Sequence, residues 1–337
     1  MNLDIKRVVG YRQFCNKLWN AVKFALTYLA DFEPTPTMLS DISINPNTSP
    51  RDLFILSRLN ATIKECNLQL SQYNFGTVTT ALHSFFLYDF CDLYLELIKP
   101  VVNNDENLPS KRCAQTTLYI CLEYFLRLTH PIMPFVTEEL WQRLPYISKM
   151  STSSSIMTAE YPKDRNEWNN PNAEYAMSII KDMIHHARSL RVDYHIANHI
   201  KADFYFRTDS KEVESIIKIQ MEDFCTLSKG NFLNQILPDI DPPKGASIKV
   251  ISDNLCLLID LTELIDVDME LNRLEKEKSR LDNQIDQYKK KIEAPGYENK
   301  VPETVKIANS EKLASLHNEL YALNSAIETF EKMKLNN

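Results

Sequence analysis

Basic side chains recur at helical spacing in residues 181–191, a pattern typical of contacts with phosphate groups. Four of them lie four, three and three positions apart and share one predicted helix face: Lys181, His185, Arg188 and Arg191. Such a stripe can follow a nucleic-acid backbone, because Lys and Arg neutralise and hydrogen-bond phosphates. An ordinary solvated helix face is the alternative.

A second basic face is predicted close to the N-terminus. Apolar residues between Phe14 and Leu29 recur at helical spacing and predict an amphipathic helix. Arg12, Lys17 and Lys23 fall on its open side and could bind phosphates, or could simply be solvated.

Two isolated residues are further candidates for RNA contact. Phe75 precedes Gly76 at a predicted helix start, where its ring could stack on an unpaired base. A buried hydrophobic staple is the alternative that we favour for Phe75. Arg58 is a lone cation on an otherwise apolar helix, and pairing with Asp52 or Glu65 is the alternative to an RNA contact.

Metal and catalytic sites are not predicted. Adjacent histidines on a helix point about 100° apart, and no HExxH motif accompanies the four histidines that cluster in sequence: His185, His186, His195 and His199. The seven cysteines are scattered singly, which predicts reduced thiols. The five glycines form neither a GxGxxG motif nor a Walker loop. No combination of nucleophile and base supports an independent hydrolase.

The composition is that of a protein able to bury a core. The chain has 337 residues, 44% of them apolar, and two or three structural units are expected. Its net charge of −7 argues mildly against nucleic acid, but the basic residues are concentrated locally. No apolar run approaches the ~20 residues of a membrane span. We therefore expect a cytoplasmic protein without a membrane partner.

The elements that must position these residues are mainly helices. Four or five long helices within residues 1–147 predict a bundle, and Ser49 and Asp52 form a predicted capping box. In LRLTHPIMPFVTEELW, Pro131 ends one helix near Thr129 and Pro134 begins the next. His130 at this corner could contact RNA or act catalytically, but capping of the last carbonyl groups is the commoner role.

The rest of the chain is predicted to form three further segments. Residues 148–171 form a linker, and residues 172–260 form a small α/β unit with a helix over 173–191 and the strands KADFYFR, ASIKV and LCLLIDL. Residues 261–337 carry two heptad seams separated by Pro295-Gly296. This pattern predicts an antiparallel coiled-coil hairpin within a mainly α protein.

Several stretches together resemble valyl-tRNA synthetase, and the resemblance spans essentially all 337 residues: NKLWN, FILSRLN, FCDLYLELIKP, LRLTHPIMPFVTEELW, ARSLRVDY and APGYENKVPETV. NKLWN and HPIMPFVTEELW have looser counterparts in the isoleucyl, leucyl and methionyl relatives. The PGYENKVP tip on a coiled coil points to the valyl enzyme. An isoleucyl enzyme would often carry clustered zinc-type cysteines late in the chain, which are absent here.

The resemblance implies a class I anticodon-binding bundle followed by a tRNA-binding arm. It implies valine tRNA as the partner, not DNA, and a role in attaching valine to that tRNA. ATP and Mg²⁺ belong to the full-length family enzyme, and no cofactor is expected in this segment. The Rossmann catalytic domain and the editing domain have no counterpart in these residues. The segment is therefore predicted to be inactive alone, and a catalytic half of the enzyme is a possible partner.

The resemblance also implies that the arm contacts the outer corner of the tRNA. Lys289, Lys290 and Lys300 lie near the arm's tip and could bind phosphates there, although coiled coils also carry lysines for solubility. One departure concerns Asp52-Leu53-Phe54, where relatives commonly read D-R-W, so a contact made by that arginine is lost here. The alternative function is a helical scaffold whose coiled coil binds protein partners.

Overall fold

The structure is a computed structural model that divides into two compact units, and each unit is described by itself. The first comprises Met1–Ile184 with Lys211–Leu227, and the second His185–Ser210 with Ser228–Asn337. The residues described are 5–145, 153–237, 240, 242–243, 245–262, 267–292, 306, 309–310, 312–313, 316–317, 320, 323–324 and 327. The boundaries of the four segments predicted from the sequence do not coincide with the boundaries of these two units, and the predicted division stays a prediction.

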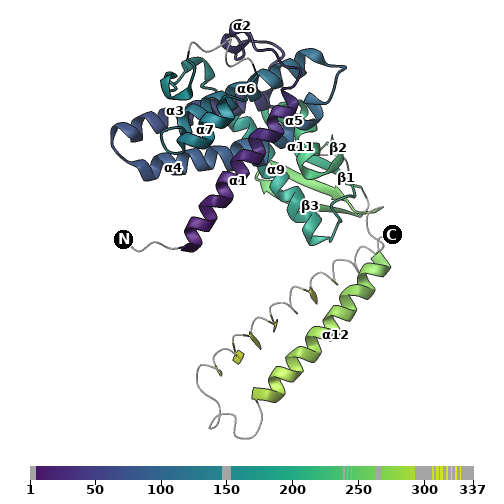
Figure 1. Ribbon diagram of the computed structural model, residues 1–337. Helices are drawn as coiled ribbons and strands as arrows, with labels where there is room; N and C mark the ends of the chain where they lie inside the picture. Colours follow the sequence, from purple (N-terminus) through teal and green to yellow (C-terminus); the bar gives the residue numbers. More distant parts are fainter. Residues whose placement is uncertain are drawn as a thin grey trace. The chain divides into compact units, whose positions relative to one another are not determined.

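The first unit is a bundle of helices (Figure 1), which confirms the predicted mainly α class. Its long helices bury continuous apolar stripes such as that of Leu18, Val22 and Leu29. Its principal helices are α1 (Ile5–Tyr28), α2 (Pro36–Ser40), α3 (Pro50–Ser71), α4 (Phe75–Ser84), η1 (Phe85–Tyr94), α5 (Leu95–Val102), α6 (Leu108–Thr129) and α7 (Pro134–Trp141). Two further helices, α10 (Lys211–Ile219) and α11 (Met221–Ser228), follow later in the chain.

The start of α3 is fixed by a buried polar cluster. The Ser49 backbone N–H donates to Asp52 Oδ2 at 3.2 Å, as the predicted capping box requires, and the Ser49 hydroxyl donates to the same oxygen at 2.6 Å. The Tyr94 hydroxyl donates to Asp52 Oδ1 at 2.7 Å. Next to it, Arg51 forms a buried ion pair with Asp223 of α11. Burial raises the pKa of Asp223 to about 6, and the charge of Arg51 opposes this rise.

The aromatic-rich helical segment of residues 75–102 is not a uniform α-helix. Its middle, η1, is a π-helix of 10 residues. Within it, Phe86 stacks on Phe90 with ring centroids 5.7 Å apart and on Phe125 of α6 at 4.7 Å. Long π-helices are rare and are frequently found at functional sites. The aromatic stack fixes this segment rigidly against α6.

The HPIMP corner is built as the sequence predicts, although His130 acts differently. α6 ends at Thr129 and α7 begins at Pro134. His130 is buried, and its Nδ1 lies 2.7 Å from the Thr137 hydroxyl of α7 instead of capping the last carbonyl groups. The bond joins the two helices directly, so the role of His130 is architectural.

The described part of the predicted linker, residues 153–170, packs on the bundle. Ile156 and Trp168 are buried, and Trp168 lies edge-on to Tyr124 with centroids 5.0 Å apart. The Tyr161 hydroxyl donates to the Leu128 carbonyl at 3.1 Å. After this segment, α9 (Pro171–Asp193) runs from the first unit into the second.

The second unit contains a mixed sheet of four strands in the order β2-β1-β4-β3. Three strands match the predicted ones: β1 (Ala202–Thr208), β3 (Ala246–Ser252) and β4 (Leu255–Asp260). The edge strand β2 (Gly230–Gln235), which pairs in parallel with β1, was not predicted. Alternate residues of β1, among them Phe204 and Phe206, are buried on one face.

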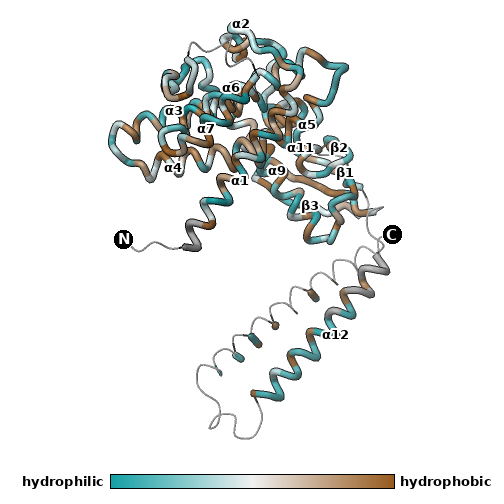
Figure 2. The backbone as a smooth tube through the Cα atoms, viewed as in Figure 1, coloured by the Kyte–Doolittle hydropathy of each residue, from teal (hydrophilic) through white to brown (hydrophobic). Residues whose placement is uncertain are grey.

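The chain then continues into α12 (Val267–Ile292). Figure 2 shows apolar residues recurring along this mostly hydrophilic helix. Near its start, Leu271 and Leu274 form a buried cluster with Ile327, and Tyr194 and Leu323 pack against it. Leu323 and Ile327 belong to the second predicted heptad seam, so the two seams meet at the ends remote from the predicted turn. The turn itself, around Pro295, lies outside the described residues.

Among the residues described, no helix is long and apolar enough to cross a membrane.

Candidate nucleic-acid interface

Helix α1 presents the predicted cations on its outer face. Leu18, Val22 and Ala25 point into the bundle and are fully buried. On the other side Arg12, Lys17 and Lys23 are exposed, as the helical spacing predicts. An exposed row of cations on one rigid helix can bind the phosphates of a nucleic-acid strand.

Two aromatic side chains on the same helix were not predicted as part of a site. Trp19 and Phe24 remain 36% and 39% exposed. The Arg143 guanidinium lies 5.6 Å from the centre of the Trp19 ring, and the Lys99 ammonium lies 5.3 Å from that of Phe24. A flat exposed ring beside a cation is suited to stacking on an unpaired base. The signal was present in NKLWNAVKF, where basic and aromatic residues alternate outside the buried stripe.

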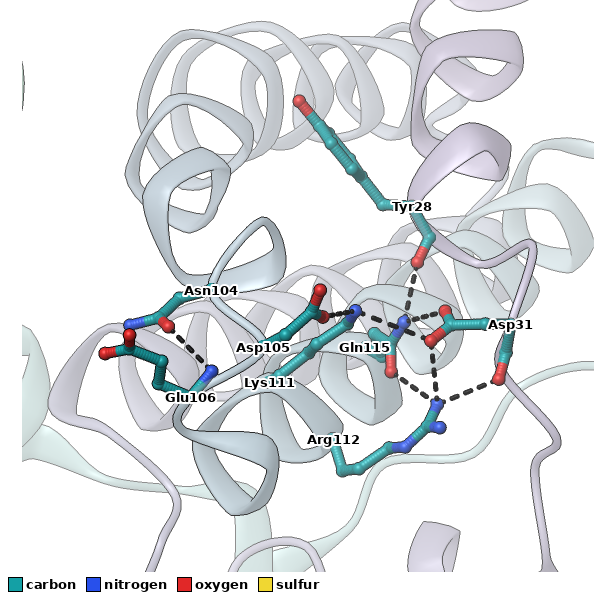
Figure 3. Close-up of polar contacts among 8 residues, drawn as sticks. All are labelled: Tyr28, Asp31, Asn104, Asp105, Glu106, Lys111, Arg112 and Gln115. Carbon is teal, nitrogen blue, oxygen red and sulfur yellow. Dashed lines mark hydrogen bonds and ion pairs between the residues drawn. The ribbon is translucent and has the colours of Figure 1, made fainter.

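A polar network holds the C-terminal end of α1 against α6 (Figure 3). The Gln115 amide donates to the Tyr28 carbonyl at 2.8 Å and to Asp31 Oδ1 at 2.7 Å. Arg112 donates to the Asp31 carbonyl at 2.9 Å, and Lys111 lies 3.5 Å from the Asp31 carboxylate. Desolvation by itself would raise the pKa of Asp31. The Gln115 hydrogen bond and the charges of Lys111 and Arg112 outweigh this effect and lower the pKa. The network fixes the direction of the helix that carries the candidate site.

Arg58 pairs with two acids other than those suggested by the sequence, and its side chain remains 38% exposed. Its Nε lies 3.1 Å from Asp89 Oδ2, and its Nη1 lies 3.3 Å from Glu174 Oε2. The sequence had suggested Asp52 or Glu65 as its partner. Desolvation by itself would lower the pKa of Arg58, but the charges and hydrogen bonds of these two carboxylates outweigh it and raise the pKa. Arg58 therefore ties α3 to η1 and α9, and its assignment as an RNA contact stays a prediction.

Two other candidate cations also lie beside acids of η1. Lys17 Nζ is 3.2 Å from Asp92, and Lys181 Nζ is 3.9 Å from Asp89. The Lys181 side chain borders a polar cleft of about 340 Å³ that also contains Arg58, Asp89 and Glu174. Because its cations already face carboxylates, this cleft does not favour an anion.

Phe75 is not the buried staple that we favoured. At the N-terminus of α4 it is 58% exposed, and its ring lies edge-on to that of Tyr73 with centroids 6.4 Å apart. Tyr73 is also exposed and has a φ of 61°, a backbone conformation that non-glycine residues seldom adopt. The turn between α3 and α4 thus displays two aromatic rings to solvent.

The basic stripe predicted on α9 is only partly present. His185 and Arg188 are exposed in the second unit, and Lys181 is exposed in the first. Arg191 is 5% exposed, and its guanidinium donates to the carbonyls of Ala197 and Ile200, each at 2.8 Å. Burial lowers the pKa of Arg191. Its donors are occupied inside the protein, which corrects its assignment as a phosphate contact.

The lysines of the arm can be placed only in part. Lys289 and Lys290 are exposed in the last turn of α12, and the neighbouring Lys291 ammonium lies 5.0 Å from the centre of the Tyr288 ring. Lys300 lies outside the described residues. Three consecutive lysines at the end of a helix provide a local positive charge on an otherwise acidic chain.

No metal site is found in the part of the chain that the structure describes, since no three His, Cys, Asp or Glu side chains are grouped to hold an ion. His185 and His186 lie edge-on to each other with centroids 5.5 Å apart. Burial raises the pKa of the Cys66 and Cys91 thiols to about 12, so neither is an activated nucleophile.

Comparison with known proteins assigns both parts of the chain. Residues 52–206 match the anticodon-binding domain of tRNA ligases, and residues 266–331 match the tRNA-binding arm of valyl-tRNA synthetases. A valine–tRNA ligase from Takifugu rubripes is 38% identical over 99% of this chain and 27% of its own length. The valine–tRNA ligase of Homo sapiens is 35% identical over 99% of this chain and 26% of its own length.

The chain belongs to the valine–tRNA ligase family. A member from Caenorhabditis elegans shows the same relationship, with 37% identity over 97% of this chain and 31% of its own length. The chain thus spans about a quarter to a third of the length of these relatives and corresponds to their C-terminal part. In this chain, α1 precedes the residues that match the anticodon-binding domain, and α12 lies at the start of the residues that match the arm.

Proposed function

We propose that this chain is the tRNA-recognising part of a valine–tRNA ligase, with the outer face of α1 bound to the anticodon stem-loop. The observation that carries the proposal is the combination of exposed cations and exposed aromatic rings on α1, in a chain of this family. Lys17 and Lys23 supply charge for phosphates, and Trp19 and Phe24 supply faces for unpaired bases. Phe75, with Tyr73, is a second candidate for stacking.

The arm forms an antiparallel coiled-coil hairpin that contacts the outer corner of the tRNA. Packing of Leu271 and Leu274 against Ile327 supports the hairpin, because it brings the two heptad seams together within one chain. It also argues against the alternative of a scaffold that dimerises through its seam. Lys289 and Lys290 are the described residues that we assign to the RNA contact.

The chain contributes to aminoacylation by positioning its tRNA, since fixing a substrate's orientation removes part of the entropic cost of reaction. Valine activation with ATP and Mg²⁺ belongs to a catalytic part of the enzyme, with which this chain would act. We therefore expect no exchange of pyrophosphate into ATP with the purified chain and valine. The cytoplasmic location stays a prediction, because relatives include a mitochondrial form from Arabidopsis thaliana.

The test is binding to a valine tRNA transcript, an unrelated tRNA and the isolated valine anticodon stem-loop, each over a salt series. The double variant Lys17→Gln/Lys23→Gln should weaken binding to the tRNA and to the stem-loop, and should reduce the salt slope by about 2, one for each phosphate contact. Phe24→Leu should weaken both about tenfold through lost stacking, with an unchanged salt slope. Lys64→Gln/Lys211→Gln removes two exposed cations outside α1 and is the control with the same change in net charge.

The arm is tested by a difference between the two RNAs. Lys289→Gln/Lys290→Gln should weaken binding to the complete tRNA and leave binding to the stem-loop unchanged, because the stem-loop lacks the outer corner. Equal loss with both RNAs would contradict a contact with that corner. Failure of the wild-type chain to prefer valine tRNA at any salt concentration would contradict the proposed function.

A further inference from the structure

The ion pair between Lys17 and Asp92 joins the proposed RNA-binding face to the π-helix. Lys17 Nζ lies 3.2 Å from Asp92 Oδ1, and the two side chains remain 44% and 57% exposed. The other two cations of this face, Arg12 and Lys23, form no ion pair with any residue that the structure describes. Lys17 is therefore held by a carboxylate in a place where an incoming phosphate can reach it.

Asp92 and Lys17 differ in how firmly the fold holds them. Asp92 belongs to η1, whose Phe86 and Phe90 rings are stacked in the core. Lys17 carries its ammonium on a flexible four-carbon stem, which can turn away from one anion toward another. The carboxylate is thus the fixed partner, and the lysine is the mobile one.

We infer that Asp92 limits the affinity of the α1 face for RNA by competing with a phosphate for the Lys17 ammonium, an inference that rests on the proposed function of α1. A phosphate that binds Lys17 must either displace Asp92 or accept a carboxylate within a few ångströms. Like charges at such a distance repel, so both routes reduce the net gain from the contact. Replacing Asp92 by a neutral side chain therefore tightens RNA binding.

The ion pair of Asp89 with Arg58 provides the contrast. The Asp89 side chain is only 11% exposed, and Glu174 holds the same arginine. Loss of the Asp89 ion pair would leave Arg58 with Glu174 as its remaining partner and would not release Arg58 for RNA binding. Of the two η1 aspartates, Asp92 is the one whose pair RNA can open.

The size of the effect follows from the exposure of the pair. Exposed ion pairs are worth about 0.2–1 kcal/mol, so removing this competing pair corresponds to a change in Kd of about 1.4- to fivefold. Salt screens both the ion pair and the repulsion, so the effect should shrink as ionic strength rises.

The experiment compares Asp92→Asn with Glu160→Gln in the complete chain, using the valine anticodon stem-loop as probe. Glu160 is an exposed acid that pairs with Lys163 and takes no part in the network that holds α1, and its replacement gives the same change in net charge. We expect Asp92→Asn to lower Kd by up to about fivefold at low salt and Glu160→Gln to change it less. Both variants should melt close to the wild-type temperature, because exposed substitutions seldom exceed ±0.5 kcal/mol.

A double-mutant cycle with Lys17→Gln separates competition from simple repulsion. If Asp92 acts through Lys17, the gain from Asp92→Asn should largely disappear when Lys17 is already glutamine. An equal gain in both backgrounds, or an equal gain from Glu160→Gln, would overturn the inference. So would weaker binding by Asp92→Asn, since Asp92 would then position Lys17 for the phosphate. These outcomes leave the proposed function intact, whereas absence of RNA binding by the wild-type chain would refute both.

Discussion

Replacing Arg191 with lysine should destabilise the second unit while leaving tRNA binding unchanged. The sequence places Arg191 in a basic stripe, but the structure buries it and directs its guanidinium at three carbonyl groups. Lysine keeps the positive charge, so a phosphate contact would largely survive the change. A single ammonium cannot reproduce the planar fork that reaches several carbonyls at once. The substitution therefore separates a structural role from an RNA-binding role.

The expected loss can be worked from the three bonds. Two of them, to Ala197 and Ile200, are 2.8 Å long, and the third, to the Lys229 carbonyl, is 3.3 Å. Hydrogen bonds to charged groups contribute about 1.5–3 kcal/mol, and lysine should retain one of the short bonds at most. Loss of the other short bond and the long bond gives about 3 kcal/mol. For a unit of this size that corresponds to a fall in Tm of about 10 °C.

Differential scanning calorimetry measures this fall, with Arg188→Lys as the control on the same helix. Arg188 is exposed, so its conservative replacement should move Tm by no more than a degree or two. Binding to valine tRNA is then measured well below both melting temperatures, where Arg191→Lys should keep the wild-type affinity and salt slope. An unchanged Tm together with weaker tRNA binding would show that Arg191 reaches RNA, and the structural assignment would be wrong.

Three further predictions concern the bundle. Because the pKa of Asp223 is raised to about 6 from an ordinary value near 4, the folded state binds this proton more tightly, and its contribution to stability grows by up to roughly 3 kcal/mol as pH falls from 7 to 4. Urea unfolding should therefore show that the free energy of unfolding of the wild type rises relative to that of Asp223→Asn as pH is lowered. A difference in free energy that does not change with pH would contradict the raised pKa. Gln115→Leu should cost about 1–3 kcal/mol by leaving the Tyr28 carbonyl unpaired, and it should also weaken tRNA binding by loosening α1. Tyr94→Phe should destabilise the start of α3 by about 1–2 kcal/mol, seen as faster amide exchange there, because Asp52 loses a buried donor.

Local features of the fold were predictable because they depend on neighbours in sequence. The capping box at Ser49 and the corner at Pro131 and Pro134 each rest on a few consecutive residues, and the structure confirms them. Strand β2 was missed because GNFLNQ has little alternation and few β-branched residues, and its pairing with β1 supplies what its sequence lacks. The π-helix was missed because its stacking partner, Phe125, lies on another helix.

The sequence predicted which cations belong to the candidate site, but it did not predict which of them already have partners within the protein. Helical spacing correctly placed Lys17 and Lys23 on an open face, since that face depends only on the buried stripe of the same helix. It could not show that Arg58 meets Asp89 and Glu174, which lie 31 and 116 positions away. Arg191 shares the spacing of its stripe, but the chain folds back over it after α9, and three carbonyls take its donors.

The same distinction explains how a chain with a net charge of −7 can still bind RNA. Net charge sums over cations that are already satisfied inside the protein, such as Arg58 and Arg191, and over acids far from any interface. A bound strand responds to the charges within about one Debye length of it, roughly 8 Å at physiological salt. On α1 the exposed cations Arg12, Lys17 and Lys23 share one face, and the Lys17 ammonium lies 3.2 Å from Asp92. The affinity of this face therefore depends on such local charge pairs more than on the composition of the whole chain.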